Sequence, residues 1–483
     1  MRVIFPLLAG FLLLAGPACR GAELDQRINA LVDASKLDGR ASLGIHVVDA
    51  ASGKTLYQRN ENRLLLPASN MKLFTTALAL LRLGPDYRFE TRVVREPSGD
   101  LTLVGSGDPS LSGRAYPYRK DTPPEPPLLA IEELADKVVA SGVERVDGDL
   151  VGDDRLYPWA PYPPSWTQDD GLWDYGAPVS ALTVADNFFT LSIHPGAHAG
   201  DPASLGLLPA LEYFTIDNRI ATVAAGGEAR VRISRLPGAR ELLVWGSIPA
   251  GHPEMREELA IDDPALYAAS ALYEALTRRG ISITGRVRAR HRSTTDDYMP
   301  PEGTTVASRM SPPLSELLQV IDKVSENLHA ELVLREVGRV MRHAATREAG
   351  LEELSALLAE TGASAEESRA EDGSGLSRNA LVTPRLVTRL LAYLYASKYR
   401  DLWISLLPVG GEDGTLSNRL CCVADGRGIR AKTGSLSRAL TLSGYADSKS
   451  NGRLAFSILV NDFSAPAGEV RQWIDKIATG LLE

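Results

Sequence analysis

Apolar residues alternate with small or polar ones near both ends of the chain, as in Leu43, Ile45 and Val47 around Gly44 and His46. This period of two is typical of half-buried strands, and helical spacing of apolar residues marks the segments between them. The predicted strands are 43–47, 55–58, 439–446 and 453–460, and the predicted helices are 24–37, 69–83 and 469–482. We expect the strands from both ends to share one antiparallel sheet with helices packed on it.

The middle of the chain, about residues 87–290, has a different pattern. It consists mostly of short strand-like runs, prolines and turns, with helical spacing only at 128–141 and 264–279. A linker at 293–304 leads into the next helix. At roughly 150 residues per domain, a chain of this length forms about three domains, or one large catalytic domain with an insertion.

Residues 1–18 have the pattern of a secretory signal. A positive charge at Arg2 precedes the apolar run 3–15, and small residues follow at 16–18, where a signal peptidase could cut. The pattern predicts an exported protein, periplasmic or extracellular. Cys19 raises an alternative, a lipid-anchored N-terminus, although Gly16 stands where an apolar residue is usual.

Composition excludes several classes of protein. Hydrophobic residues make up 44% and charged residues 23%, which is typical of a folded chain and not of a disordered or fibrous one. The formal net charge of −9 argues against nucleic acid as a partner, because phosphate backbones are bound by clustered Lys and Arg. Three cysteines and the lack of an H-E-x-x-H motif predict neither a metal nor a cofactor.

The first chemical motif is Ser69-Asn70-Met71-Lys72. On a helix, residues three apart lie on one face, so the Ser69 hydroxyl and the Lys72 amine can meet. A serine hydroxyl needs an adjacent base to act as a nucleophile, and a lysine is a base only when desolvation or a nearby positive charge keeps it neutral. The motif occurs once in the chain.

Two further motifs follow. In Ser325-Glu326-Asn327, the hydroxyl can relay a proton and the amide can donate to a substrate carbonyl. By itself this segment also fits an ordinary helix cap. In Lys432-Thr433-Gly434-Ser435, a cation and two hydroxyls stand beside a glycine that lets a substrate backbone approach.

In this order the three motifs resemble the signature of penicillin-interacting serine acyl-transferases. Their flanking segments are similar to those of one family, the class C low-molecular-mass penicillin-binding proteins, which are D-alanyl-D-alanine carboxypeptidases and endopeptidases. The segments are 105–109, 178–182, 311–314, 372–377 and 407–416. The resemblance implies an α+β, transpeptidase/β-lactamase-like domain, an antiparallel sheet with helices on both sides. Its parts would be 23–86 and 305–483, with one or two β-rich accessory domains inserted at 87–290.

The resemblance also implies roles for the motif residues. Ser69 would attack the carbonyl between two D-amino acids of a peptidoglycan stem peptide, and Lys72 would take its proton. Ser325 and Lys432 would pass a proton to the departing amine, while Asn327 would orient Lys72 and the substrate amide. Penicillin and other β-lactams would acylate the same hydroxyl.

Substrate contacts are expected from the third motif and from one acidic residue. The resemblance assigns the terminal carboxylate to Thr433 and Ser435, next to Gly434, and an oxyanion hole to the backbone N–H groups of Ser69 and Ser435. Asp153 resembles by position a carboxylate that recognises the free amine of the stem peptide.

Two alternatives stay open. A secreted serine β-lactamase would need a carboxylate that activates the deacylating water, and the sequence assigns none. A peptidoglycan-binding scaffold with an inactive site would not need three intact motifs. The sequence does not separate carboxypeptidase from endopeptidase activity, because both break the bond after a D-residue.

Overall fold

The computed structural model describes residues 17–34, 39–421 and 428–483, with side chains from residue 24 onwards. Strands from both ends of the chain form one five-stranded antiparallel sheet, as predicted. Its order is β18 (Ile429–Leu436), β19 (Ala439–Ser448), β20 (Gly452–Asn461), β1 (Ser42–Asp49) and β2 (Thr55–Arg59). The predicted signal segment 1–18 lies almost entirely outside the described residues.

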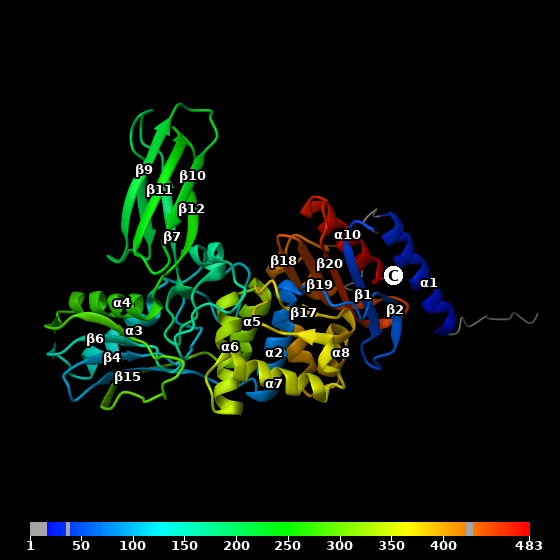
Figure 1. The fold of residues 1–483 in the computed structure, drawn as a ribbon, viewed down its shortest axis with the longest axis horizontal. Coiled ribbons are helices and arrows are strands. Elements are labelled where there is room, and N and C mark those ends of the chain that lie inside the picture. The colour runs from blue at the N-terminus through cyan, green and yellow to red at the C-terminus, as the bar shows by residue number, and fades with distance from the viewer. Residues whose placement is uncertain (1–16, 35–38, 422–427) are drawn as a thin grey trace, which may run out of the picture.

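Helices cover both faces of this sheet (Figure 1). One face packs on the two terminal helices, α1 (Pro17–Ala34) and α10 (Ala467–Gly480). The other face packs on a larger helical layer. That layer contains α2 (Met71–Arg82), α5 (Leu314–Val324), α6 (Asn327–Arg342), α7 (Arg347–Glu360), α8 (Pro384–Ala396) and α9 (Arg400–Leu406), with the short strands β16 (Ser368–Arg369) and β17 (Leu381–Val382) beside it.

The prediction that the first strand is half-buried is wrong. All residues from Leu43 to Val48 of β1 are buried, including Gly44 and His46. A Cβ atom at Gly44 would lie 2.7 Å from Cγ of Pro384, so glycine is what lets α8 pack directly on the strand. The His46 ring is bonded to the Thr388 hydroxyl at 2.5 Å. The alternation therefore reflects close helix packing and not exposure to water.

The middle of the chain builds separate sheets. Five strands, mixed parallel and antiparallel, pack against α3 (Leu129–Ala140) and α4 (Pro264–Arg278), which match the predicted helices to within a residue. Their order is β14 (Val287–Arg290), β6 (Leu150–Asp153), β4 (Leu101–Val104), β3 (Glu90–Arg95) and β15 (Thr304–Met310), and beside them β5 (Arg145–Val146) pairs with β13 (Ser282–Ile283).

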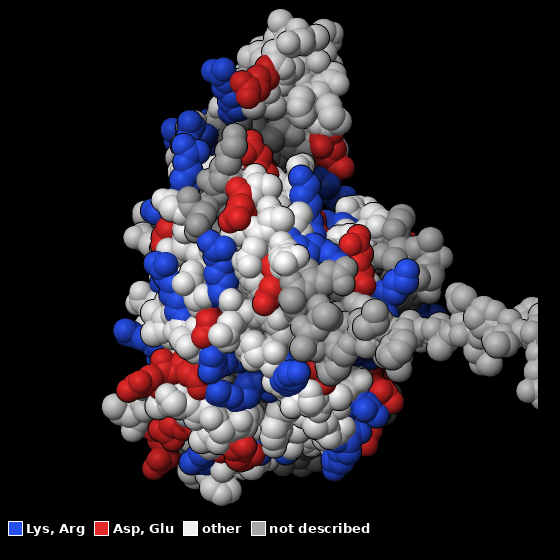
Figure 2. All heavy atoms as spheres, turned by 90° about the vertical axis from the view of Figure 1, so that its right-hand side faces the viewer, with Lys and Arg blue, Asp and Glu red and all other residues white. Residues whose placement is uncertain are grey.

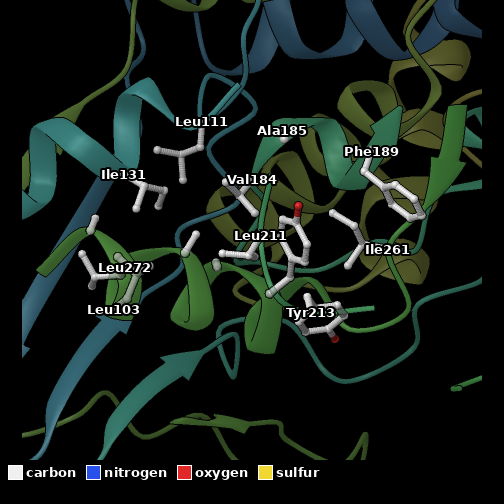
Figure 3. Packing of buried hydrophobic residues seen from close by; sticks show 14 of the residues in the cluster. Leu103, Leu111, Ile131, Val184, Ala185, Phe189, Leu211, Tyr213, Ile261 and Leu272 are labelled. Atoms are coloured by element: carbon white, nitrogen blue, oxygen red, sulfur yellow. The ribbon is translucent and has the colours of Figure 1, made fainter. Parts of the chain in front are cut away.

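Two three-stranded sheets project from this region (Figure 1). The first has the order β12 (Met255–Ala260), β7 (Phe188–His194) and β8 (Ser204–Leu208), and the second has the order β10 (Arg230–Arg235), β11 (Glu241–Pro249) and β9 (Thr215–Val223). One hydrophobic core joins all the sheets of the middle region, and its buried members all fall between Val93 and Ala307 (Figure 3).

The surface carries charges of both signs. On the face shown in Figure 2, Lys and Arg side chains are interspersed with Asp and Glu side chains. Within the part of the chain that the structure describes, no helix is both long enough and apolar enough to cross a membrane.

Candidate active site

Ser69 lies in a single turn of 3-10 helix (Ala68–Asn70) that leads into α2. The serine is partly exposed, whereas α2 behind it is almost entirely buried. The turn is tied to the sheet, because the side-chain amide of Asn70 donates to the Ser443 hydroxyl of β19 at 2.6 Å. A rigid, buried helix thus presents the hydroxyl at its N-terminal end.

Lys72 is fully buried and its amine reaches three partners. Nζ lies 3.1 Å from Oγ of Ser69, 2.6 Å from Oδ1 of Asn327 and 2.8 Å from the carbonyl oxygen of Ser374. The amide and carbonyl oxygens only accept hydrogen bonds, whereas the Ser69 hydroxyl can also donate. A neutral amine can therefore donate twice and direct its lone pair at the Ser69 proton.

The environment of Lys72 favours that neutral form. Burial lowers the pKa of Lys72 to about 8, because its charge is removed from water, and the nearby carboxylates, Asp372 first among them, only partly oppose this. None of the three hydrogen-bond partners carries a charge.

Ser325 and Asn327 form the corner between α5 and α6. Ser325 ends α5 in the left-handed conformation, with φ of 69°, which is uncommon for a residue with a side chain and is concentrated at functional sites. The corner points the serine hydroxyl at Lys432 and the Asn327 carbonyl at Lys72. The Asn327 amide nitrogen donates to the carbonyl oxygen of Tyr175 at 2.7 Å, which fixes its orientation.

Lys432 lies on β18 and is also fully buried. Its Nζ donates to Oγ of Ser325 at 2.8 Å and to the carbonyl oxygen of Thr433 at 2.9 Å, both of them neutral groups. Burial, and after it the charge of Lys72, lowers the pKa of Lys432 well below its usual range. Lys72 on α2 and Lys432 on β18 thus approach one cluster of hydroxyl groups, the first lysine from a helix and the second from a strand.

Gly434 lets β18 lie directly against the turn Ala68–Asn70 that carries the nucleophile Ser69 (the nucleophile turn). A Cβ atom there would collide with the Thr441 hydroxyl and lie 2.8 Å from the Pro67 carbonyl oxygen and 3.0 Å from the backbone nitrogen of Ser69. β18 is an edge strand of the sheet, so an extended peptide can lie along its outer side. Ser435 is exposed there.

The structure therefore assembles the three predicted motifs around one hydroxyl. Comparisons with known proteins agree with that arrangement. The model of the D-Ala-D-Ala carboxypeptidase 3 (S13) family matches residues 24–481. The chain belongs to this family. The predicted resemblance to D-alanyl-D-alanine carboxypeptidases among the penicillin-binding proteins is confirmed.

Relatives of this S13 chain extend over most of its length. It is 37% identical to a D-alanyl-D-alanine carboxypeptidase of Actinomadura sp. (strain R39), over 100% of this chain and 89% of the relative. Its fold is similar to the crystal structure of penicillin binding protein 4 (dacB) from Haemophilus influenzae, with a TM-score of 0.79, 22% identity, and coverage of 94% of this chain and 98% of the other. The predicted α+β fold class is confirmed.

Two carboxylates of the site were missed by sequence reasoning because they act through the backbone. Asp372 accepts hydrogen bonds from the backbone N–H groups of Gly375 and Ser377. Glu331 accepts from the N–H groups of Gly373 and Ser374. Together they shape the loop whose Ser374 carbonyl holds Lys72. The sequence singled out segment 372–377 only because it resembles a segment of the family. The structure shows what the segment does, which is to place the Ser374 carbonyl oxygen against the Lys72 amine.

A third carboxylate, Asp322, was also missed. It lies on α5, three residues before Ser325, and is fully buried with no hydrogen-bond partner for either carboxylate oxygen among the described residues. Burial raises the pKa of Asp322, and the charges of Lys432 and Lys72 oppose that shift. When it is ionised, the Asp322 carboxylate opposes the lowering of the pKa of both Lys72 and Lys432.

The structure does not bring Asp153 to this cluster. Asp153 lies on β6 in the middle region, is 1% exposed, and both of its carboxylate oxygens are bonded to Arg155, with the closest contact at 2.6 Å. A buried carboxylate already paired with a guanidinium has no free acceptor for a substrate amine. The predicted substrate contact at Asp153 therefore has no support in the geometry.

The described residues contain no group of three or more His, Cys, Asp or Glu side chains placed to hold a metal ion. The site is built from hydroxyls, amines and amides.

Proposed function

We propose that the chain is an exported serine DD-peptidase that cleaves D-alanyl-D-alanine bonds, and crosslinks that follow a D-alanyl residue, in peptidoglycan. Support comes from membership of the S13 family and from the arrangement of the two lysines around Ser69. The reaction needs no cofactor.

The steps follow from the contacts. The lone pair of Lys72 takes the Ser69 proton as Oγ attacks the scissile carbonyl carbon, and the developing oxyanion accepts hydrogen bonds from the backbone N–H groups of Ser69 and Ser435. The C–N bond then breaks to leave an acyl-enzyme. Ser325 delivers its proton to the departing amine and is reprotonated by the Lys432 amine that is hydrogen-bonded to it. The proton that Lys72 took from Ser69 restores Lys432 through the same cluster of hydroxyls, so the acyl-enzyme forms with no net gain or loss of protons. Water afterwards hydrolyses the ester and frees Ser69.

The substrate would enter along β18. The terminal carboxylate lies beside the hydroxyls of Thr433 and Ser435, where Thr433 Oγ1 is held by Thr415 at 2.8 Å. This assignment explains why a strand edge, a glycine and two hydroxyls occur together.

One observation carries the proposal: the Lys72 amine is buried, bonded to two obligate acceptors and 3.1 Å from the Ser69 hydroxyl. Without a neutral base at that position, a serine hydroxyl does not attack an amide at useful rates.

β-Lactams would acylate Ser69, because their strained amide reacts as the substrate amide does. Rapid hydrolysis of the product would require a free carboxylate to activate water. The carboxylates near Lys72 are occupied or enclosed: Glu331 and Asp372 bind backbone N–H groups, Glu326 pairs with Arg114, and Asp322 is fully buried. This favours a penicillin-sensitive peptidase over a β-lactamase.

The same proposal includes the division of the chain. Residues 23–86 and the C-terminal part of the chain would form the catalytic domain around an insertion that begins near residue 87. We place the end of the insertion after β15 and not at residue 290, because β15 pairs with β3 in the sheet of the middle region and Ala307 belongs to its core. Residues 1–18 would direct export, and Cys19 is the candidate for a lipid anchor.

The test is incubation of the purified protein with defined monomeric and crosslinked muropeptides, followed by mass analysis. We expect release of D-alanine, cleavage of the crosslink, or both, with unchanged rates in EDTA. Ser69→Ala should show neither product formation nor covalent labelling by fluorescent penicillin. Inhibition by EDTA, or full activity of Ser69→Ala, would overturn the mechanism. Fast turnover of nitrocefin would favour the β-lactamase instead.

A further inference from the structure

A cavity of about 650 Å³ lies outside the catalytic cluster, between the loop 162–173 and the end of β10. Three aromatic side chains line it, Tyr162, Trp166 and Trp173, and Tyr162 is 44% exposed. Open cavities with several large rings in one wall are unusual on a surface unless a ligand covers them.

The polar groups of the cavity differ from those of an apolar peptide groove. Gln168 and Asp169 are exposed at its edge, and Arg235 and Asp262 lie in its wall. Oδ1 of Asp262 is buried and has no hydrogen-bond partner within the described part of the chain. An unpaired buried acceptor is unfavourable unless a donor from a ligand or water reaches it.

This combination suits a sugar ring. A pyranose has a flat face of C–H groups, which packs on aromatic rings, and a rim of hydroxyl groups, which bonds to carboxylates, amides and guanidinium groups. A peptide side chain that is wholly apolar would leave the polar rim of the cavity unpaired. A phosphate would meet the carboxylates of Asp169 and Asp262.

The cavity is connected to the catalytic cluster by two contacts. The Trp166 indole N–H donates to Oδ2 of Asp372 at 2.9 Å, and Asp372 shapes the loop that holds Lys72. Two residues beyond Trp173, the carbonyl oxygen of Tyr175 holds the Asn327 amide. One loop thus lines the cavity and also reaches the reacting groups.

We propose that this cavity is a carbohydrate subsite that takes a sugar ring of the glycan bearing the stem peptide. The inference rests on the proposed function, because it assumes a peptidoglycan substrate. In such a substrate the scissile bond and the sugar lie at opposite ends of a short peptide, which spans at most about 3.5 Å per residue. A subsite beside the catalytic cluster would bind the sugar while the far end reacts.

The test compares two substrates with the same stem peptide, one free and one attached to its disaccharide. The wild-type protein should prefer the sugar-bearing substrate by about fivefold in kcat/KM, as one or two ring contacts provide. Tyr162→Ala should remove that preference, leaving kcat/KM for the free peptide and the rate of fluorescent-penicillin labelling unchanged. Tyr393→Ala, an exposed tyrosine on α8, is the matched control and should keep the preference.

A second variant and a binding measurement guard against a folding defect. Gln168→Ala changes only an exposed side chain of the cavity edge and should also weaken the preference. In the Ser69→Ala background, the disaccharide without peptide should quench tryptophan fluorescence in a saturable way, and Tyr162→Ala should weaken that binding.

The outcomes separate the two proposals. Equal cleavage of both substrates by the wild type, with no disaccharide binding, overturns the subsite and leaves the peptidase intact. Cleavage of neither substrate, with no penicillin labelling, overturns the proposed function itself. Preference for the sugar in Tyr162→Ala and Gln168→Ala equal to that of the wild type places the sugar elsewhere and overturns the inference.

Discussion

The middle region and the catalytic cluster both bury ionisable groups, but two paired aspartates of the middle region contrast with the lysines of the catalytic cluster. In the middle region, Asp186 is paired with Arg114 at 2.6 Å and with His329 at 2.8 Å. These partners overcome the effect of burial and hold the pKa of Asp186 well below its usual range. Asp153 is likewise buried and paired, with Arg155 at 2.6 Å.

In the catalytic cluster the buried charges have neutral partners or none. Lys72 and Lys432 are bonded only to hydroxyl, amide and carbonyl groups, and Asp322 has no hydrogen bond in the described chain. Unpaired burial shifts a pKa towards the neutral form, whereas pairing preserves the charge. The comparison teaches that the paired aspartates Asp186 and Asp153 serve structure, whereas burial without a charged partner shifts the two lysines of the catalytic cluster towards the neutral form that the chemistry needs.

The largest effect should follow removal of the unpaired base. Lys72→Ala should lower the rate of acylation by fluorescent penicillin by about 10⁴-fold, because Lys72 is the one base bonded to the Ser69 hydroxyl among the described residues. The rate is measured by labelling over time, with circular dichroism to confirm folding. Lys54→Ala, on the surface, should label like the wild type. Substantial labelling of Lys72→Ala would mean that another base acts.

Breaking a pair in the middle region should damage stability instead. Arg155→Ala leaves the carboxylate of Asp153 buried beside Arg290, which is 3.8 Å away, and should destabilise the fold by about 3 kcal/mol. Urea denaturation measures the loss, and the labelling rate of the folded fraction should not change. Arg219→Ala removes an exposed pair with Asp217 and should have no measurable effect. Equal stability of Arg155→Ala and the wild type would contradict the contrast.

A smaller effect is expected where the strand meets the nucleophile turn. Gly434→Ala places a Cβ atom against the Thr441 hydroxyl and 3.0 Å from the Ser69 nitrogen, so β18 must move away. A displacement of this size should slow acylation by about 50-fold. Gly428→Ala, just before the same strand and with nothing within 4 Å of its Cβ position, should acylate normally. Identical rates for both variants would show that close approach is unimportant.

The smallest effect concerns pH. Since the neutral form of Lys72 is the base, acylation should rise with pH and level off above a midpoint near 8. The ionised carboxyl of Asp322 raises the pKa of Lys72, so Asp322→Asn should move the midpoint down by about half a pH unit. Rates of penicillin labelling between pH 5 and 10 measure the shift. Asp108→Asn, another fully buried aspartate, should leave the midpoint in place. An upward shift in Asp322→Asn would contradict the assigned sign.

Local patterns were sufficient for part of this site. Ser69 and Lys72 are three residues apart on consecutive helical turns, so their contact could be predicted from spacing alone. Lys432 and Ser325 are far apart in the chain, and only the order of the motifs indicated that they meet. The strands near both ends and the helices at 69–83 and 469–482 were predicted to within two residues, because one periodic pattern decides each of them. The first helix begins at Pro17 and not at residue 24, and residues 35–37 of the predicted helix lie outside the described residues.

The features of the site that were not predicted depend on side chains that distant helices and strands place beside a residue. Asp322 matters because Lys72 on α2 and Lys432 on β18 lie near it. Both lysines are far from Asp322 in the sequence, so the residues around Asp322 do not reveal this proximity. The substrate contact at Asp153 stays a prediction, and its position in the chain did not reveal that Arg155 turns back onto it. His46 and Gly44 looked exposed because the packing of α8 on β1 is not visible in a pattern of polarity.

The pairing of β1 with β20, in which Ile45 lies opposite Ile458, also has a consequence for biosynthesis. The core of the middle region is complete once residue 307 has been made, but the central sheet must wait until β20 has been made, at residue 461. Ser69 and Lys72 are translated early, whereas Lys432, which completes the cluster, is translated late. A nascent chain that has not yet reached Lys432 therefore cannot assemble a reactive hydroxyl.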